Sequence, residues 1–149
     1  MKQTVIIMLL IASPAAAQNW ERTSNVLPSV NVGASMMHAG NSGPRWACLG
    51  LNTGIAMGIT EILKRTVRED RPDHSDRRSF PSGHTTLAAV TSGPWLSVGI
   101  PLTLGTAAGR IGARKHHWWD TVAGGLIGFS VQRWGCHSPE SGGVNWGRR

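Results

Sequence analysis

Two histidines and one carboxylate supply the groups that a transfer reaction needs. His116 and Asp120 are four positions apart. On a helix they share a face, so the carboxylate can accept a hydrogen bond from one imidazole nitrogen. That bond fixes the tautomer and leaves the other nitrogen as a nucleophile. His84 lies at a predicted helix start, where it can protonate a leaving oxygen and later take a proton from water.

Three fixed cations accompany these groups. Lys64 precedes Arg71 by seven residues, and Arg110 comes shortly before the His–Asp pair. Such cations stabilise the negative charge that spreads over the equatorial oxygens in phosphoryl transfer, and the fork of an arginine can bind two oxygens. Ser82 and Gly83 open a helix whose free amide groups attract an anion. The pattern predicts a site for phosphate or another tetrahedral oxyanion.

A metal site is the competing interpretation of the histidines. His116, His117 and Asp120 have ligand-like spacing, and His84 could join them. Three cations in the same site would repel a metal ion, and the chain has no HExxH or CxxC pattern. We therefore expect no metal and no other cofactor.

The motifs resemble those of the type 2 phosphatidic acid phosphatase / vanadium haloperoxidase superfamily. They are KRTVREDRP at 64–72, PSGH at 81–84 and RIGARKHHWWD at 110–120. The resemblance covers about residues 46–134, and the three motifs together are highly specific.

The resemblance implies a helical bundle and a phosphatase that needs no metal. His116 would be the nucleophile that forms a phosphohistidine, His84 the general acid, and Asp120 the residue that orients His116. The phosphate-binding set that the resemblance implies is Lys64, Arg71, Ser82, Gly83 and Arg110.

Gly109 departs from the family pattern, which usually has serine there. The missing hydroxyl bears on rate and substrate preference. It is also the one feature that favours a non-catalytic phosphate- or phospholipid-binding protein. A vanadate-dependent haloperoxidase is the other alternative, because vanadate mimics phosphate, although so short a chain leaves little room for a halide site.

An all-α bundle of about five helices must bring these residues together, since the sequence shows no repeat and no alternating strand pattern. We expect the 46–64 helix to be buried, a kink at Pro94, and a polar loop over 67–79. The expected helices cover about 30–37, 46–64, 84–98, 102–111 and 117–133.

The first residues predict a secretory signal. Lys2 precedes an apolar run over 5–12 and an Ala15-Ala16-Ala17 cleavage site. Eight apolar residues are far fewer than the roughly 20 of a spanning helix. We expect an exported, periplasmic or extracellular protein. The expected divisions are a signal peptide over 1–17, a covering segment over 18–45, a phosphatase core over 46–134 and a disordered tail over 135–149.

The net charge of +7 suits nucleic acid, an anionic membrane or a phosphorylated substrate. No basic tract with interleaved aromatic residues appears, so we expect no nucleic-acid partner. The expected partner is a phosphate monoester, either lipid or soluble.

The segment 85–109 is uncharged, which at first suggests a membrane span. If His84 and Arg110 share a site, however, the segment must go out and return. Each arm of about a dozen residues would reach roughly 18 Å, short of a ~30 Å hydrocarbon core. We therefore expect at most peripheral contact with a membrane, with Trp95 near the hairpin tip.

Cys48 and Cys136 are the only cysteines. In an oxidising compartment they could form a disulfide, or they could remain two buried thiols. The sequence leaves both open, because it does not give the distance between the two Cα atoms.

Overall fold

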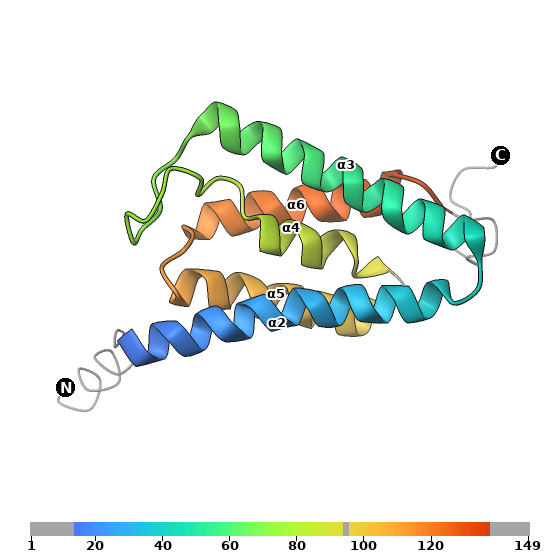
Figure 1. Ribbon diagram of the computed structural model, residues 1–149, viewed down its shortest axis with the longest axis horizontal. Helices are drawn as coiled ribbons and strands as arrows, with labels where there is room; N and C mark the ends of the chain where they lie inside the picture. Colours follow the sequence, from blue (N-terminus) through green and yellow to red (C-terminus); the bar gives the residue numbers. More distant parts are fainter. Residues whose placement is uncertain (1–13, 94–95, 138–149) are drawn as a thin grey trace.

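The computed structural model describes residues 14–93 and 96–137. Those residues form five α-helices and no β-strand, which confirms the all-α prediction. The four longer helices run along the long axis of the molecule and surround the short α4 (Figure 1). The helices are α2 (Pro14–Ala39), α3 (Gly43–Val67), α4 (Gly83–Val90), α5 (Leu96–Gly112) and α6 (Trp118–Trp134).

The N-terminal region differs from the prediction, because a single helix of 26 residues replaces the short helix expected over 30–37. The helix continues through the buried Pro28 and contains the expected cleavage site at Ala17. Close packing against α5 explains its length. At Gly109, for example, an added Cβ would lie only 2.7 Å from the Cβ of Ser24. Tertiary contact here overrides the weak helix propensity of an Asn-, Ser- and Gly-rich sequence.

The prediction of one helix over 84–98 is also wrong, because α4 ends at Val90 and α5 begins at Leu96. Thr91 and Ser92 turn their hydroxyl groups back onto carbonyls of the last turn of α4. Such bonds compete with the helical ladder and favour its end. The uncharged segment that begins at residue 85 does run away from the charged end as α4 and return to it as α5, as predicted. The expected kink at Pro94 and the tail beyond His137 lie outside the described residues.

Helix α3 matches its expected position but is not buried. It begins after Ser42, whose side chain accepts a hydrogen bond from the backbone N–H of Arg45. Only the stripe of Asn52, Ala56 and Thr60 is buried, because α3 has neighbours on one side only. The large apolar side chains of the other faces are exposed, namely Leu51, Ile55, Ile59 and Ile62.

The core is built from small and polar side chains. The buried hydrophobic residues are alanines and one valine, and the largest fully buried side chains are those of Thr, Asp, Pro and Ser. Glycines let helices approach closely: a Cβ on Gly124 would lie 2.5 Å from the carbonyl oxygen of Ser82, and one on Gly128 would lie 2.5 Å from that of Thr86. α6 therefore lies directly against α4.

A disulfide joins Cys48 on α3 to Cys136 after α6, with the Cα atoms 5.0 Å apart. The side chain of Asn52 adds two hydrogen bonds: it donates to the carbonyl of Cys136 at 3.0 Å and accepts from its N–H at 2.8 Å. The bridged positions are 88 residues apart, so the cross-link restricts the unfolded chain and stabilises the fold by about 4 kcal/mol.

In the part of the chain that the structure describes, charge is confined to the two ends of the bundle. Most charged residues lie near the 68–82 loop, at the end where α3 finishes and α6 begins (Figure 1). Arg45 and Arg133 lie at the opposite end. No Asp, Glu, Lys or Arg occurs in the stretches 23–44, 46–60, 79–109 and 121–132.

Exposed large apolar side chains cover the uncharged middle. They occur on all four outer helices, with examples at Val30, Ile55, Leu104 and Leu126. Among the described residues, α3 is the one helix long and apolar enough to cross a membrane. The buried core helix of a soluble protein can pass the same test, but only 17% of the apolar window of α3 is buried.

Candidate active site

The three sequence motifs meet at the charged end of the bundle, where α3 and α5 finish and α4 and α6 begin (Figure 1). The ring of His84 interacts electrostatically with all three predicted cations and with the second histidine. The structure therefore brings together Lys64, Arg71, His84, Arg110, His116 and Asp120.

His116 and Asp120 form a buried pair, with 2% and 0% of their side chains exposed. The His116 Nδ1 atom lies 3.6 Å from Asp120 Oδ2. The same oxygen accepts hydrogen bonds from the Ser79 hydroxyl and, at 2.8 Å, from the His117 N–H. Burial pushes the pKa of Asp120 upward, but these contacts outweigh it and lower the pKa to about 2. Asp120 is thus a carboxylate at neutral pH.

Both histidines have lowered pKa values. Burial is the main cause for each ring, and the neighbouring cations add to it. The pKa of His84 falls to about 4. The hydrogen bond with Asp120 partly opposes the decrease in the pKa of His116. Both rings are therefore neutral at neutral pH, so His116 retains the lone pair that a nucleophile requires.

Arg110 is 4% exposed and has no carboxylate partner within the described residues. Its Nη1 donates to the side-chain oxygen of Asn25 at 3.1 Å, and its Nε has no hydrogen-bond partner. The carboxylates of Glu21 and Asp73 act on this guanidinium only from a distance. A buried cation without a counter-ion in contact is costly, so Arg110 suits an anionic ligand. Arg71 is steadied by an ion pair with Asp76 at 2.8 Å.

The side chain of Lys64 forms hydrogen bonds with the loop that precedes α4. Its Nζ donates to the carbonyls of Arg78 at 2.9 Å, Ser79 at 3.5 Å and Pro81 at 2.5 Å. Burial, with help from Arg71 and other charges, lowers its pKa to about 8. Lys64 thus positions the loop that leads into the PSGH motif while it adds positive charge to the site.

Ser82 occupies the N-cap position of α4, as predicted, but its side chain makes no cap hydrogen bond. Its hydroxyl oxygen accepts from Thr85 Oγ1 at 3.1 Å, and its N–H donates to the Asp120 carbonyl at 2.9 Å. The fully buried Ser82 therefore joins the starts of α4 and α6. A Cβ on Gly83 would meet its nearest neighbour, Met57, at 3.7 Å, so packing does not require glycine there.

Four contributors to the site lie outside the predicted set. Ser79 and Asn25 bond to Asp120 and Arg110, which are 41 and 85 positions away, so no local spacing signals them. Glu69 accepts from Trp119 Nε1 at 2.8 Å, and the Trp119 ring stacks on His117 at 4.5 Å. In the sequence, only the two tryptophans that follow His117 pointed to this contact between Glu69, Trp119 and His117.

The ligand set of the metal alternative is reproduced only in part, at His117 and Asp120. Within the described residues, the atoms that could share an ion belong to Glu69, His117 and Asp120, and they lie within 4.8 Å of one another. His84 and His116 are not in this group. The Asp120 oxygen nearest His117 already accepts two hydrogen bonds. Glu69 and Asp120 Oδ2 are thus engaged in hydrogen bonds, whereas the buried His117 Nδ1 has no hydrogen-bond partner.

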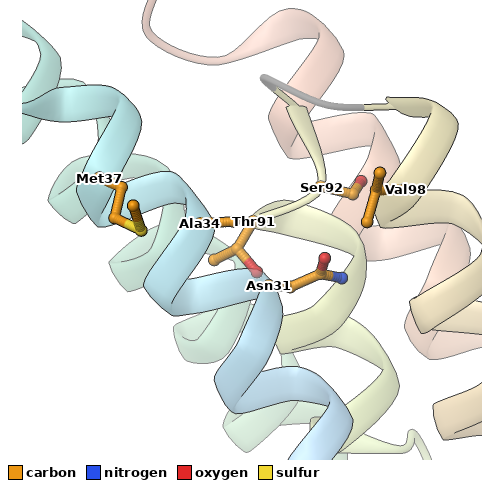
Figure 2. Close-up of a pocket in the computed structure, with 6 residues that line it drawn as sticks. All are labelled: Asn31, Ala34, Met37, Thr91, Ser92 and Val98. Carbon is orange, nitrogen blue, oxygen red and sulfur yellow. The ribbon is translucent and has the colours of Figure 1, made fainter.

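A pocket of about 240 Å³ lies elsewhere, between α2, the end of α4 and the start of α5 (Figure 2). It contains none of the histidines or cations of the charged end. Its lining residues are Asn31, Ala34, Met37, Thr91, Ser92 and Val98. The reactive groups are thus separate from this cavity.

The curated proteins that this helical chain resembles are phosphatases. The decaprenylphosphoryl-5-phosphoribose phosphatases of two Mycobacterium tuberculosis strains are each 32% identical to it over 100 residues, which is 58% of this chain and 56% of theirs. The protein of the same name from Mycolicibacterium smegmatis is 33% identical over 93 residues, 53% of this chain and 52% of its own. The chain spans about half the length of these relatives. No protein-family model and no solved structure matches it.

Proposed function

We propose that this protein is a phosphomonoester hydrolase that works through a phosphohistidine on His116. The observation that carries the proposal is the buried Arg110, which has no carboxylate in direct contact, beside two neutral histidines. Such a site offers an anion a counter-charge and a nucleophile together. The names of the relatives support the same reaction class.

In the proposed first step, the substrate phosphate pairs with Arg71 and Arg110. The nitrogen of His116 that faces away from Asp120 attacks phosphorus, and the bond from phosphorus to the ester oxygen breaks. Asp120 stabilises the positive charge that forms on the ring. His84 donates its proton to the leaving oxygen. The bound dianion raises the pKa of His84 from about 4, which lets the ring carry this proton.

In the second step, His84 takes a proton from water, and the resulting hydroxide attacks the phosphohistidine. The bond between phosphorus and nitrogen breaks, inorganic phosphate leaves, and His116 is restored. The proposed steps use only side chains of the charged end.

We also propose that the substrate is the phosphate ester of a lipid. The relatives are named for a decaprenylphosphoryl compound. The exposed apolar side chains of the uncharged middle suit contact with hydrocarbon, so the charged end would lie at the level of lipid headgroups. Export through the predicted signal peptide belongs to the same proposal.

The non-catalytic alternative loses its support. Gly109 had favoured it, but packing explains this residue, since a Cβ there would lie 2.7 Å from the Cβ of Ser24 and 3.1 Å from the carbonyl oxygen of Trp20. The close approach of α2 therefore accounts for glycine at this position by packing alone.

The direct test measures phosphate release by the full chain from a lipid phosphate and from a soluble phosphate ester, with and without a chelator. His116→Ala should abolish release and the acid-labile phosphoenzyme, whereas the exposed His137→Ala is the matched control and should retain both. Equal rates for wild type and His116→Ala would reject the proposal. Halide oxidation with vanadate and peroxide would favour the haloperoxidase, and loss of activity with the chelator would favour a metal enzyme.

A further inference from the structure

Ser79 links the loop that precedes the PSGH motif to the carboxylate behind the nucleophile. It is fully buried, and its hydroxyl donates to Asp120 Oδ2. It lies outside all three motifs. We propose that Ser79 is a positioning residue that holds the Asp120 carboxylate in the orientation which His116 needs. The role in turnover rests on the proposed function, whereas the orientation of the resting His116 ring does not.

The hydroxyl of Ser79 is itself held in place by the backbone around it. The Ser79 N–H donates to the carbonyl of Glu69 at 3.0 Å, and its own carbonyl accepts from Lys64 at 3.5 Å. Lys64 also bonds to the carbonyl of Arg78 at 2.9 Å. The residue therefore has little freedom to move, which is what a positioning group requires.

The hydrogen bonds to the carboxylate converge on one of its two oxygens. Oδ2 accepts from Ser79 and from the His117 N–H, and it faces His116 Nδ1 at 3.6 Å. The buried Oδ1 has no hydrogen-bond partner. Loss of the Ser79 hydroxyl would leave a single donor, so the carboxylate could rotate and exchange its oxygens. The His116 ring would then lose its fixed tautomer.

Asp120 is surrounded by groups that also titrate, and Ser79 is the neutral side chain that donates a hydrogen bond to it. Removal of the hydroxyl changes no charge, so any shift in pH dependence reports on the carboxylate itself. Loss of a donor to the charged form raises the pKa of Asp120. The titratable groups that face Asp120 are Lys64 from α3, Glu69 from the loop, and His116 and His117 from the turn before α6.

The kinetic test is a double-mutant cycle with Ser79→Ala and Asp120→Asn. A hydrogen bond to a charged group corresponds to a loss of about ten- to a hundredfold in kcat. KM should hardly change, because Ser79 is fully buried and its hydroxyl is bonded to Asp120. In the pH profile of Ser79→Ala, the acid limb of kcat/KM should move to higher pH than in the wild type. In the Asp120→Asn background, Ser79→Ala should have almost no further effect.

Ser35→Ala is the matched control, because Ser35 is also a buried serine whose hydroxyl donates a hydrogen bond, in its case to the carbonyl of Thr91. It should leave kcat and the acid limb unchanged. If Ser79→Ala does not fold, Ser79→Cys keeps the shape and a weak donor, and should give an intermediate loss. An equal loss in wild-type and Asp120→Asn backgrounds would overturn the proposal.

A second measurement separates this proposal from the proposed function. Nitrogen-15 NMR of the resting protein reports the tautomer of the His116 ring without any turnover. A single tautomer in wild type and a mixture in the folded Ser79 variant support positioning even if the protein releases no phosphate. The same tautomer in both proteins would reject positioning, whatever the enzymatic activity.

Discussion

The ammonium group of Lys64 combines two properties that make activity depend on pH. It bonds to three loop carbonyls, and its pKa is lowered to about 8. Deprotonation in the empty enzyme would loosen the loop and remove positive charge. We therefore predict that kcat/KM falls as pH rises through about 8. In the complex, the substrate anion raises this pKa, so the decline of kcat should come at higher pH.

The variant that checks this prediction is Lys64→Arg, which stays charged throughout the range. Its maximal activity should be lower, because the planar fork cannot reproduce the bonds of an ammonium. Its alkaline limb should move upward or disappear in a profile from pH 6 to 10. An unchanged limb would show that another group controls it.

The same lowered pKa has a consequence for stability with a defined sign. Between pH 8 and the ordinary lysine value of 10.5, the folded state holds fewer protons at Lys64 than the unfolded state. The contribution of this group to the free energy of unfolding therefore rises with pH across that window. Activity and stability should change in opposite directions there.

Single residues also show how far the sequence predicts the site. Spacing identifies His84, His116 and Asp120, because the chemistry of each is tied to a neighbour within its own motif. The sequence does not predict the roles of Ser79 and Asn25, because their partners are 41 and 85 positions away and only the packed bundle brings them near. Lys64 was predicted as a phosphate ligand from its charge, whereas its contacts with the loop depend on where the chain turns.

At the scale of the helices, Gly124 sets the distance between α4 and α6. A Cβ there would lie 2.5 Å from the Ser82 carbonyl oxygen, whereas one on Gly125 would meet its nearest neighbour at 3.9 Å. We predict that Gly124→Ala lowers the free energy of unfolding by about 1–3 kcal/mol and lowers kcat, since it pushes the start of α4 away from Asp120. Gly125→Ala should be neutral or stabilising by up to about 1 kcal/mol. Chemical denaturation and phosphate release measure the two effects, and equal behaviour of the variants would contradict the packing argument.

A second contact between helices gives a prediction about the departure at Gly109. Replacement by serine, the residue that the resemblance described above leads us to expect, would place its Cβ 2.7 Å from that of Ser24 on α2. Gly109→Ser should therefore destabilise the protein by about 1–3 kcal/mol instead of improving it. Gly54→Ser, whose Cβ would meet nothing within 4 Å, is the control and should fold normally. A stable, more active Gly109→Ser variant would show that α2 can move aside.

The helices differ in how well the sequence predicts them. The prediction for α6 was correct to within one residue at each end, because its segment has no proline and is bounded by His117 and Gly135. Helix α2 was underestimated and the 84–98 helix was overextended. Both errors come from contacts between helices: α2 is ordered by its packing on α5, and Gly99 brings the start of α5 against Ser92 at the end of α4.

Across residues 14–93 and 96–137 the molecule has the reverse of a typical soluble distribution, with threonine, serine and alanine inside and large apolar side chains outside. Small residues at helix contacts are typical of bundles in lipid, where backbones approach closely. Tryptophans near both charged ends, at Trp46, Trp118 and Trp134, suit the two interfaces of a bilayer. With 25 residues, α3 reaches about 37 Å, which exceeds a ~30 Å hydrocarbon core. We therefore propose that the bundle is embedded in a membrane, which goes further than the peripheral contact expected from the sequence.

Cell fractionation gives the prediction at this scale. The full chain should remain in the membrane pellet after alkaline carbonate extraction and should dissolve in mild detergent. A lysine at Leu104, in the uncharged middle, should cost about 2.5–3.5 kcal/mol and deplete the membrane pool, because a charge in hydrocarbon is expensive. Val67→Lys makes the same kind of change beside the charged loop and should have little effect. If the middle faces water instead, carbonate will release the protein and both lysines will be tolerated, since exposed substitutions usually change stability by less than about 0.5 kcal/mol.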